Sequence, residues 1–369
     1  MNASSSFSQL GGSLRVRPGQ QPAIIGSRPL LAARLLRGQP PEAAAQRLPL
    51  LYSLCGQAHR LTAQLAISAA LQGQTNTHVA ASQALLAETR REHLRRVLLD
   101  WPPLLDPGAP RPSPGELRAW DQAPETAMTF WLGGPIRAWL QQWEDDPHHA
   151  LLEWTERNEH WLSRMLANCR KDADALQLPV HALQLITDTP ALHAVADHLR
   201  RSTDFALRPE LNGQPCETGS WTRFGETHPE RYTSAWLRLG ARVAELARLS
   251  LPDARPPALG VMALGQDEAL AWSETARGLL LHRVCLERSG SNVLIADYQI
   301  VAPTEWNLHP QGVLALALSS LSSADPRSQR QAELLMAAFD PCIAFTLETG
   351  PKTALETDKD NHQGQSSHA

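Results

Sequence analysis

The sequence predicts an α+β fold that is mainly helical, with long core helices and a β-hairpin near its C-terminus. In several long stretches apolar residues recur every three or four positions, a spacing typical of helices packed against a core. Later in the chain, Leu279–Leu286 and Val293–Ala302 are rich in alternating and β-branched residues and flank the loop ERSGSN. This pattern predicts two antiparallel strands joined by a turn at Ser289-Gly290-Ser291.

The helices are expected in four regions. The first begins at Pro41-Glu42, where proline suits a first turn, and carries Cys55 on a mostly apolar stripe. A second helix is expected from His78 to Asp100, and residues 135–249 are expected to be mostly helical. A last helix should run from about Ser328 to Phe339 and stop before Pro341, because the residue preceding a proline is biased out of the helical conformation.

The chain is expected to form one large domain over residues 22–350, between a flexible N-terminus (1–21) and a disordered tail (351–369). Both ends are polar and lack apolar periodicity, although short extended pieces are expected at Leu14–Val16 and Ala23–Ile25. Six prolines in residues 102–114 predict a stiff loop. That loop could separate two domains; we interpret it as an excursion within one.

Composition disfavours several classes of protein. The formal net charge is −4 and there is no long basic run, which argues against nucleic acid or an anionic membrane surface as a partner. No apolar stretch is long enough to span a membrane, and the first residues resemble no signal peptide. The five cysteines are scattered and form no C-x-x-C pair, which suits a reducing compartment. A cytoplasmic location is therefore expected.

The two loops that flank the hairpin carry polar groups. Arg277 precedes the first strand and Thr304 follows the second, and antiparallel strands bring such outer ends together. The surrounding patterns, E-x-x-R-G-x-x-x-H and Y-Q-x-V-x-P-T-x-W-N, resemble the C-terminal half of nickel–iron hydrogenase large subunits. In that family the Arg and the Ser/Thr are partners of the cyanide ligands on iron. The resemblance therefore implies a place for a cyanide-bearing iron group beside Arg277 and Thr304.

Other segments resemble landmarks of the same family in the same order, from about Leu51 to Glu348. Taken singly, each has an ordinary structural explanation, such as a buried cysteine or a helix stop. Their shared order along one chain favours membership of the family. The segments are Leu54-Cys55-Gly56, Leu99-Asp100-Trp101, Gly213–Gly219 with Arg223, and Asp340-Pro341-Cys342.

The departures from the family pattern concern the metal ligands. Catalytic members carry two Cys-x-x-Cys motifs, in which the first cysteine binds nickel terminally and the second bridges nickel and iron. Here Cys55 and Cys342 remain, but the bridging positions hold Ala58 and Phe345, and the processing histidine is replaced by Glu348. Alanine and phenylalanine offer no lone pair to a metal. We therefore expect no nickel and no hydrogen turnover.

This pattern is similar to the HupK/HoxV group of hydrogenase maturation proteins. The resemblance implies a non-catalytic scaffold that transiently holds an Fe(CN)₂CO group before transfer to the large subunit. Cys55 and Cys342 would bind the metal, and Arg277 and Thr304 would bind the cyanides. The implied partners are a small iron-carrying maturation chaperone and the hydrogenase large-subunit precursor. Two alternatives stay open: a metal-free structural chaperone that mimics the large subunit, and a mononuclear thiolate-metal redox enzyme.

Overall fold

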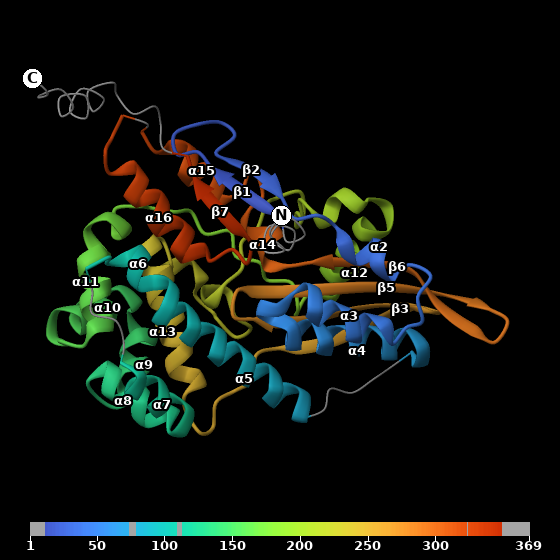
Figure 1. The fold of residues 1–369 in the computed structure, drawn as a ribbon, viewed down its shortest axis with the longest axis horizontal. Coiled ribbons are helices and arrows are strands. Elements are labelled where there is room, and N and C mark those ends of the chain that lie inside the picture. Colours follow the sequence, from blue (N-terminus) through green and yellow to red (C-terminus); the bar gives the residue numbers. More distant parts are fainter. Residues whose placement is uncertain (1–11, 74–78, 109–112, 323, 349–369) are drawn as a thin grey trace, which may run out of the picture.

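The computed structural model describes residues 12–73, 79–108, 113–322 and 324–348 of the chain. Figure 1 shows a helical lobe around α13 on one side and a four-stranded sheet, covered by helices, on the other. A small second sheet lies above their junction, where the first and last described segments meet.

The larger sheet is antiparallel throughout, in the order β3-β4-β5-β6. Its strands are β3 (Leu259–Gly265), β4 (Glu268–Thr275), β5 (Gly278–Ser289) and β6 (Asn292–Val301). Alternate residues face opposite layers: Ala269 and Ala271 pack with α4, whereas Leu270 packs with α12. The sheet is therefore the middle layer of a helix–sheet–helix sandwich.

The predicted hairpin is confirmed, with β5 and β6 slightly longer at the turn than expected. The turn contains only Gly290 and Ser291, and Gly290 has a φ of 61° that favours glycine. One irregularity in register, between Cys285 and Leu286, interrupts the pairing. The outer part of the hairpin projects from the body of the molecule (Figure 1).

The first predicted helix is broken where Cys55 lies. Instead of one continuous helix there are α3 (Ala43–Leu51), the 3₁₀ turn η1 (Ser53–Cys55) and α4 (Gly56–Gln72). Pro49 lies in the last turn of α3 and has no N–H to donate, and Tyr52 leaves the helical region with φ −119° and ψ 61°. Cys55 thus precedes α4 as its N-terminal flanking residue and does not lie on a helical stripe.

The second predicted helix is also divided. It comprises α5 (Val79–Arg95), a π-helical turn η2 (Arg96–Asp100) and α6 (Trp101–Leu105). The predicted Pro-rich loop over residues 102–114 is too long at both ends. Pro102 and Pro103 lie in the first turn of α6, and Pro114 begins α7. A first helical turn tolerates proline, since its N–H groups have no helical partner. Residues 109–112 lie outside the described residues.

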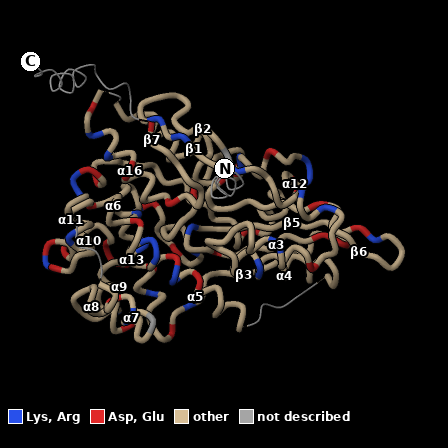
Figure 2. The backbone as a smooth tube through the Cα atoms, in the orientation of Figure 1, with Lys and Arg blue, Asp and Glu red and all other residues tan. Residues whose placement is uncertain are grey.

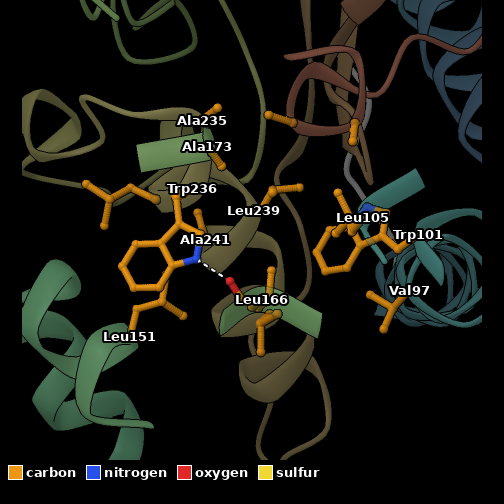
Figure 3. Close-up of a cluster of buried hydrophobic side chains, with 14 of the residues drawn as sticks. Val97, Trp101, Leu105, Leu151, Leu166, Ala173, Ala235, Trp236, Leu239 and Ala241 are labelled. Carbon is orange, nitrogen blue, oxygen red and sulfur yellow. Dashed lines mark hydrogen bonds between the residues drawn. The ribbon is translucent and has the colours of Figure 1, made fainter. Parts of the chain in front are cut away.

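The helical lobe surrounds α13 (Ala235–Leu249), of which every residue except Arg248 is buried. In Figure 3, Trp236 projects from α13 among Leu151, Leu166 and Ala173, and its Nε1 donates to the Leu166 carbonyl at 2.9 Å. The remaining helices and turns are α2 (Leu31–Leu36), α7 (Pro114–Gln122), α8 (Pro124–Leu132), α9 (Ile136–Asp145), α10 (Pro147–Arg157), α11 (Trp161–Asp174), α12 (Thr189–Arg201), η3 (Thr203–Ala206), η4 (Ser220–Thr222), η5 (Pro229–Arg231), α14 (Pro303–Asn307) and α15 (Val313–Ser320).

The last predicted helix is α16 (Ser328–Phe339), which ends at Asp340 in a left-handed conformation with φ 45°. Beyond it, β7 (Ala344–Leu347) runs parallel to β1 (Ser13–Val16), which pairs antiparallel with β2 (Ile24–Ser27). The flexible segment expected over residues 1–21 therefore does not extend through β1, because backbone pairing with β7 and β2 holds that strand. Residues 1–11 and the expected tail 351–369 lie outside the described residues.

Charged residues of both signs are interspersed over the described chain, with a concentration where α5 and α13 approach the sheet (Figure 2). Within the described residues no helix combines the length and the apolar character that crossing a membrane requires.

Candidate functional site

Cys55 immediately precedes α4, so the start of this helix determines its position. No side chain of α4 itself caps the first N–H groups of the helix. Instead the Glu88 carboxylate, on α5, accepts the backbone N–H of Gln57 at 2.7 Å and that of Ala58 at 2.8 Å. These contacts satisfy donors that a helix N-terminus leaves free. A side chain from a neighbouring helix therefore sets the position of the turn that carries Cys55.

Cys342 is held by three contacts with two side chains. Its backbone N–H donates to the Thr304 hydroxyl at 3.2 Å, and its Sγ lies 2.9 Å from the same oxygen. The Arg28 guanidinium donates from Nη2 to the sulfur at 2.6 Å. Thr304 lies in α14, directly after β6, so the outer end of the hairpin reaches the segment beyond α16.

Arg277 occupies the tight turn between β4 and β5, and its side chain is buried. The turn closes because Gly278 has a φ of 128° and lies against Thr218, which leaves no room for a side chain. Arg277 Nη1 donates to Glu92 at 3.2 Å, and Nε lies 3.4 Å from Asp340. Burial alone would lower the pKa of Arg277, but Asp340 and then the two cysteines raise it, so the guanidinium stays charged.

The electrostatics of Cys55 show that the predicted residues converge. Burial raises the pKa of the Cys55 thiol, and the neighbouring Cys342 raises it further, while Arg277 and Arg28 lower it. Cys55, Cys342, Arg277 and Thr304 therefore gather in one place, although they come from four different segments. Both sulfur-bearing residues are partly exposed.

The two substituted positions add no ligand. Ala58 is fully buried in α4, and Phe345 is half-buried in β7. Within the described part of the chain, no group of three or more His, Cys, Asp and Glu side chains is arranged to hold a metal ion. The site thus offers two thiols and a set of cations, and any metal held there must bring further ligands of its own.

Asp340 connects the site to the helical lobe. Its buried carboxylate faces three guanidinium groups: Arg96 Nε at 2.7 Å, Arg242 Nη1 at 3.1 Å and Arg277 Nε at 3.4 Å. Burial would raise the pKa of Asp340, but the three arginines outweigh it and lower the pKa. One carboxylate, two residues before Cys342, therefore joins η2, α13 and the β4–β5 turn.

The histidine of the hairpin motif does not reach the cysteines. His282 is buried in the sheet, with its Nε2 2.9 Å from His59 Nδ1 and its Nδ1 2.7 Å from the Tyr298 hydroxyl. Burial lowers its pKa to about 3. His59 in turn stacks on Tyr52, with ring centroids 4.2 Å apart. The His59–His282 pair therefore packs against Tyr52, three residues before Cys55.

The Gly213–Gly219 segment has a structural role. Glu217 forms a fully buried ion pair with Arg238 of α13 at 2.9 Å. Thr218 accepts the backbone N–H of Leu279 at 3.0 Å and exchanges two 2.8 Å hydrogen bonds with the Asn307 side-chain amide. The segment therefore supports the ends of the hairpin.

A cavity of about 810 Å³ lies apart from the cysteines, and its wall includes Arg223 and Glu245. Arg223 Nη2 donates to Glu245 Oε2 at 2.9 Å, and His93 Nε2 lies 2.8 Å from the same oxygen. His93 Nδ1 lies 3.1 Å from Arg242, one of the partners of Asp340. Polar contacts thus link this cavity to the site through the interior.

Sequence reasoning missed Arg28, Glu88 and Glu305. Arg28 Nε lies 3.8 Å from Glu305 Oε1, and its guanidinium carbon lies 5.5 Å from the centre of the Tyr52 ring. Burial would lower the pKa of Arg28, but Glu305 and Cys342 outweigh it and raise the pKa. One signal existed: Glu305 stands in the Pro-Thr-x-Trp-Asn loop where catalytic large subunits have threonine, so a buried carboxylate there needed a cation.

Comparison with known proteins identifies the fold. A solved structure of the Ni-Fe-Se hydrogenase of D. vulgaris Hildenborough in the reduced state aligns with a TM-score of 0.52 at 15% identity, over 87% of this chain and 93% of that one. The NiFeSe-hydrogenase of Dm. baculatum aligns with a TM-score of 0.51 at 14% identity, over 87% and 94%. The predicted large-subunit-like α+β fold is confirmed. No family model matches the chain.

Curated relatives identify the family. The hydrogenase expression/formation protein HoxV of Cupriavidus necator is 40% identical, over 92% of this chain and 96% of the relative. The hydrogenase expression/formation protein HupK of Azotobacter vinelandii is 30% identical, over 92% and 99%. Since both similarities extend over nearly the whole of each protein, the chain belongs to the HoxV/HupK family of hydrogenase expression/formation proteins.

Proposed function

We propose that this protein is a non-catalytic scaffold in nickel–iron hydrogenase maturation, which transiently holds an Fe(CN)₂CO group before its transfer to the large subunit. One observation carries the proposal: Cys55 and Cys342 converge beside Arg277, while the two bridging positions hold Ala58 and Phe345. The names of the relatives, hydrogenase expression/formation proteins, support the role in maturation.

The charges around the two thiols suit an anionic group. Ferrous iron with two cyanides, one carbonyl and two thiolates is dianionic, and such a group needs fixed cations where it is buried. Arg277 and Arg28 both act on the cysteines and both stay protonated. Each can donate a charge-assisted hydrogen bond. Nε of Arg277 makes no aligned hydrogen bond, and its 3.4 Å ion pair with Asp340 fixes the orientation of the guanidinium.

Thr304 has a second task in this structure. Its hydroxyl accepts the N–H of Cys342 and lies within hydrogen-bond distance of the sulfur. When the sulfur binds iron, the hydroxyl proton becomes free to turn towards a cyanide while its oxygen keeps the backbone contact. We therefore assign Thr304 both the positioning of Cys342 and a neutral hydrogen bond to the cargo.

Two other functions make different predictions. A metal-free chaperone that mimics the large subunit would carry no iron, and a mononuclear thiolate-metal redox enzyme would turn over a substrate. Iron analysis separates the first from the scaffold, and hydrogen uptake with a dye separates the second. The expression/formation names of the relatives favour a role outside catalysis.

The partners follow from the proposed role. A carrier must receive its cargo and pass it on, so we propose transient complexes with a small iron-carrying maturation chaperone and with the hydrogenase large-subunit precursor, in the cytoplasm. Transient interfaces are often small and polar. Repeated pull-downs from a host that assembles hydrogenase, recovering neither partner, would contradict this part of the proposal.

The decisive experiment is infrared spectroscopy of the protein purified from a hydrogenase-producing host. Coordinated cyanide and carbonyl absorb where protein does not, so bands in that window report the cargo directly. Cys55→Ala and Cys342→Ala should each abolish the bands, because each deletes a metal bond. Cys285→Ala is the matched control, since Cys285 is also free and partly exposed but lies on β5 in the hairpin. Bands that persist in a Cys55→Ala/Cys342→Ala double variant would refute the proposal.

A further inference from the structure

Arg28 lies in the segment between β2 and α2, and no sequence motif singles it out. Its side chain is about 10% exposed, yet it reaches across the fold to Cys342, 314 positions later. Its Nη2 donates to the sulfur at 2.6 Å, the shortest contact that this thiol makes with a described residue. This largely buried cation competes with any metal for the lone pairs of the same sulfur.

Glu305 fixes the orientation of this cation. Its Oε2 accepts the backbone N–H of Ala302 at 3.2 Å, so the carboxylate is held at the start of α14. Its Oε1 lies 3.8 Å from Arg28 Nε. The ring of Tyr52 lies below the guanidinium, which adds a cation–π contact. The carboxylate therefore faces the Nε side of Arg28, and the Nη2 side is left for the sulfur.

The contact between Arg28, Glu305 and Cys342 differs from the pattern of catalytic large subunits. In catalytic large subunits the position of Cys342 binds nickel, and threonine stands where Glu305 is found. Here a carboxylate and an arginine appear together in contact with each other and with that cysteine. A fixed positive charge at the sulfur attracts an anionic group and repels a second free cation, because Coulomb energies are large in a partly buried site.

We propose that Arg28 determines the charge specificity of this site. Its guanidinium, oriented by Glu305, supplies the positive charge that nickel supplies in catalytic large subunits. The thiols therefore accept an anionic metal group and reject free divalent cations. The inference rests on the proposed function in taking the cargo to be anionic. The rejection of free cations, however, is a property of the empty protein and can be measured without any cargo.

The test is titration of the purified full-length, metal-free protein with Co²⁺, whose thiolate charge-transfer absorption reports sulfur coordination. Arg28→Gln should bind Co²⁺ at least tenfold more tightly than the unmodified protein, with the thiolate band. Arg28→Lys keeps the positive charge and should bind no more tightly than the unmodified protein. Cys342→Ala in the Arg28→Gln background should remove the gain, which ties it to this sulfur.

Removal of Arg28 alone leaves the Glu305 carboxylate without its partner and could prevent folding. The double variant Arg28→Gln/Glu305→Thr removes both charges, restores the threonine of catalytic large subunits, and should show the same gain in Co²⁺ affinity. Circular dichroism checks the fold of each variant. Equal Co²⁺ affinity in the Arg28→Gln, Arg28→Lys and unmodified proteins would overturn the inference. An equal gain in the Gln and Lys variants would also overturn it, because the size of the Arg28 side chain, and not its charge, would then limit Co²⁺ binding.

The two proposals fail in different measurements. Infrared bands in the unmodified protein, together with a Co²⁺ affinity that the Arg28→Gln change leaves as it was, would overturn only the role of Arg28. A gain in Co²⁺ affinity with no infrared bands in the unmodified protein would refute the carrier function and support cation rejection.

Discussion

Replacing Arg277 by leucine separates cargo binding from stability, because the partners of Arg277 have other cations. Asp340 keeps Arg96 at 2.7 Å and Arg242 at 3.1 Å, and Glu92 keeps Arg95 at 3.3 Å. Breaking an isolated buried ion pair costs about 3–5 kcal/mol. Since neither carboxylate is left alone, we expect Arg277→Leu to lower the free energy of unfolding by only about 1–2 kcal/mol.

The effect on the cargo should be larger. A hydrogen bond from a charged donor contributes about 1.5–3 kcal/mol, so its loss corresponds to roughly 10- to 150-fold weaker binding of the anionic group. The measurement is infrared band intensity per mole of protein, beside a urea unfolding curve for the same preparation. We expect the bands to fall steeply while the protein stays folded.

Arg96→Leu is the matched control. It removes a shorter contact to Asp340, and a second to Asp100 at 3.1 Å, so it should cost at least as much stability as Arg277→Leu. Arg277 and Arg28 are among the charges that act most strongly on the Cys55 thiol, and Arg96 is not one of them. Arg96→Leu should therefore retain the bands. If band intensity simply follows stability in both variants, Arg277 is only structural and the reasoning fails.

Four further outcomes are expected. Thr304→Val removes two neutral hydrogen bonds, one to the cargo and one from the Cys342 N–H, each of about 0.5–1.5 kcal/mol. Cargo loading should therefore fall in part, with a small shift in the cyanide bands; complete loss would contradict this assignment. Glu88→Ala leaves two N–H groups of α4 unpaired and should lower the free energy of unfolding by about 1–2 kcal/mol in urea, whereas an unchanged curve would exclude a capping role. The unmodified protein should show neither stoichiometric nickel by metal analysis nor hydrogen uptake. Ala58→Cys/Phe345→Cys should allow nickel to bind once Arg28→Gln also removes the repelling charge. Burial would raise the pKa of Glu245, but Arg223 and His93 outweigh burial and lower it. The ionised carboxylate therefore stabilises the fold above the ordinary carboxyl pKa of about 4.3, and this stabilisation is lost as the pH falls towards the lower pKa of the folded protein. Glu245→Gln should make the free energy of unfolding decline less steeply over that acidic range.

The sequence predicts best where a periodic pattern meets a sharp turn signal. The hairpin follows from strand-like alternation on both sides of Gly290, and its outer ends bring Arg277 and Thr304 into one region as expected. The end of α16 follows from Pro341, which leaves Cys342 just beyond the helix. Both features are local, and the short-range rules of chain geometry determine them.

The remaining parts of the site depend on contacts that no local pattern encodes. Arg28 lies in an irregular segment and meets Cys342 only because β1 pairs with β7, which brings the two ends of the described chain together. Glu88 appears as one of several charges on an exposed-looking helix, and its role depends on how α5 packs against α4. The break before Cys55 was missed because apolar spacing continues through it, while Pro49 and Tyr52 end the helix.

The backbone beside each cysteine is held by contacts within the protein. The backbone at Cys342 is fixed by Thr304 and by the left-handed Asp340, whose carboxylate is held by arginines from three segments. The backbone after Cys55 is fixed by Glu88. In a four-thiolate bimetallic site the bridging sulfurs join the two cysteine segments through metal. Here Arg277 joins Asp340, two residues before Cys342, to Glu92 of α5, and Glu88 of the same helix holds the Cys55 segment. Under the proposed carrier function, these contacts would keep both cysteine segments in place while the cargo is loaded and released.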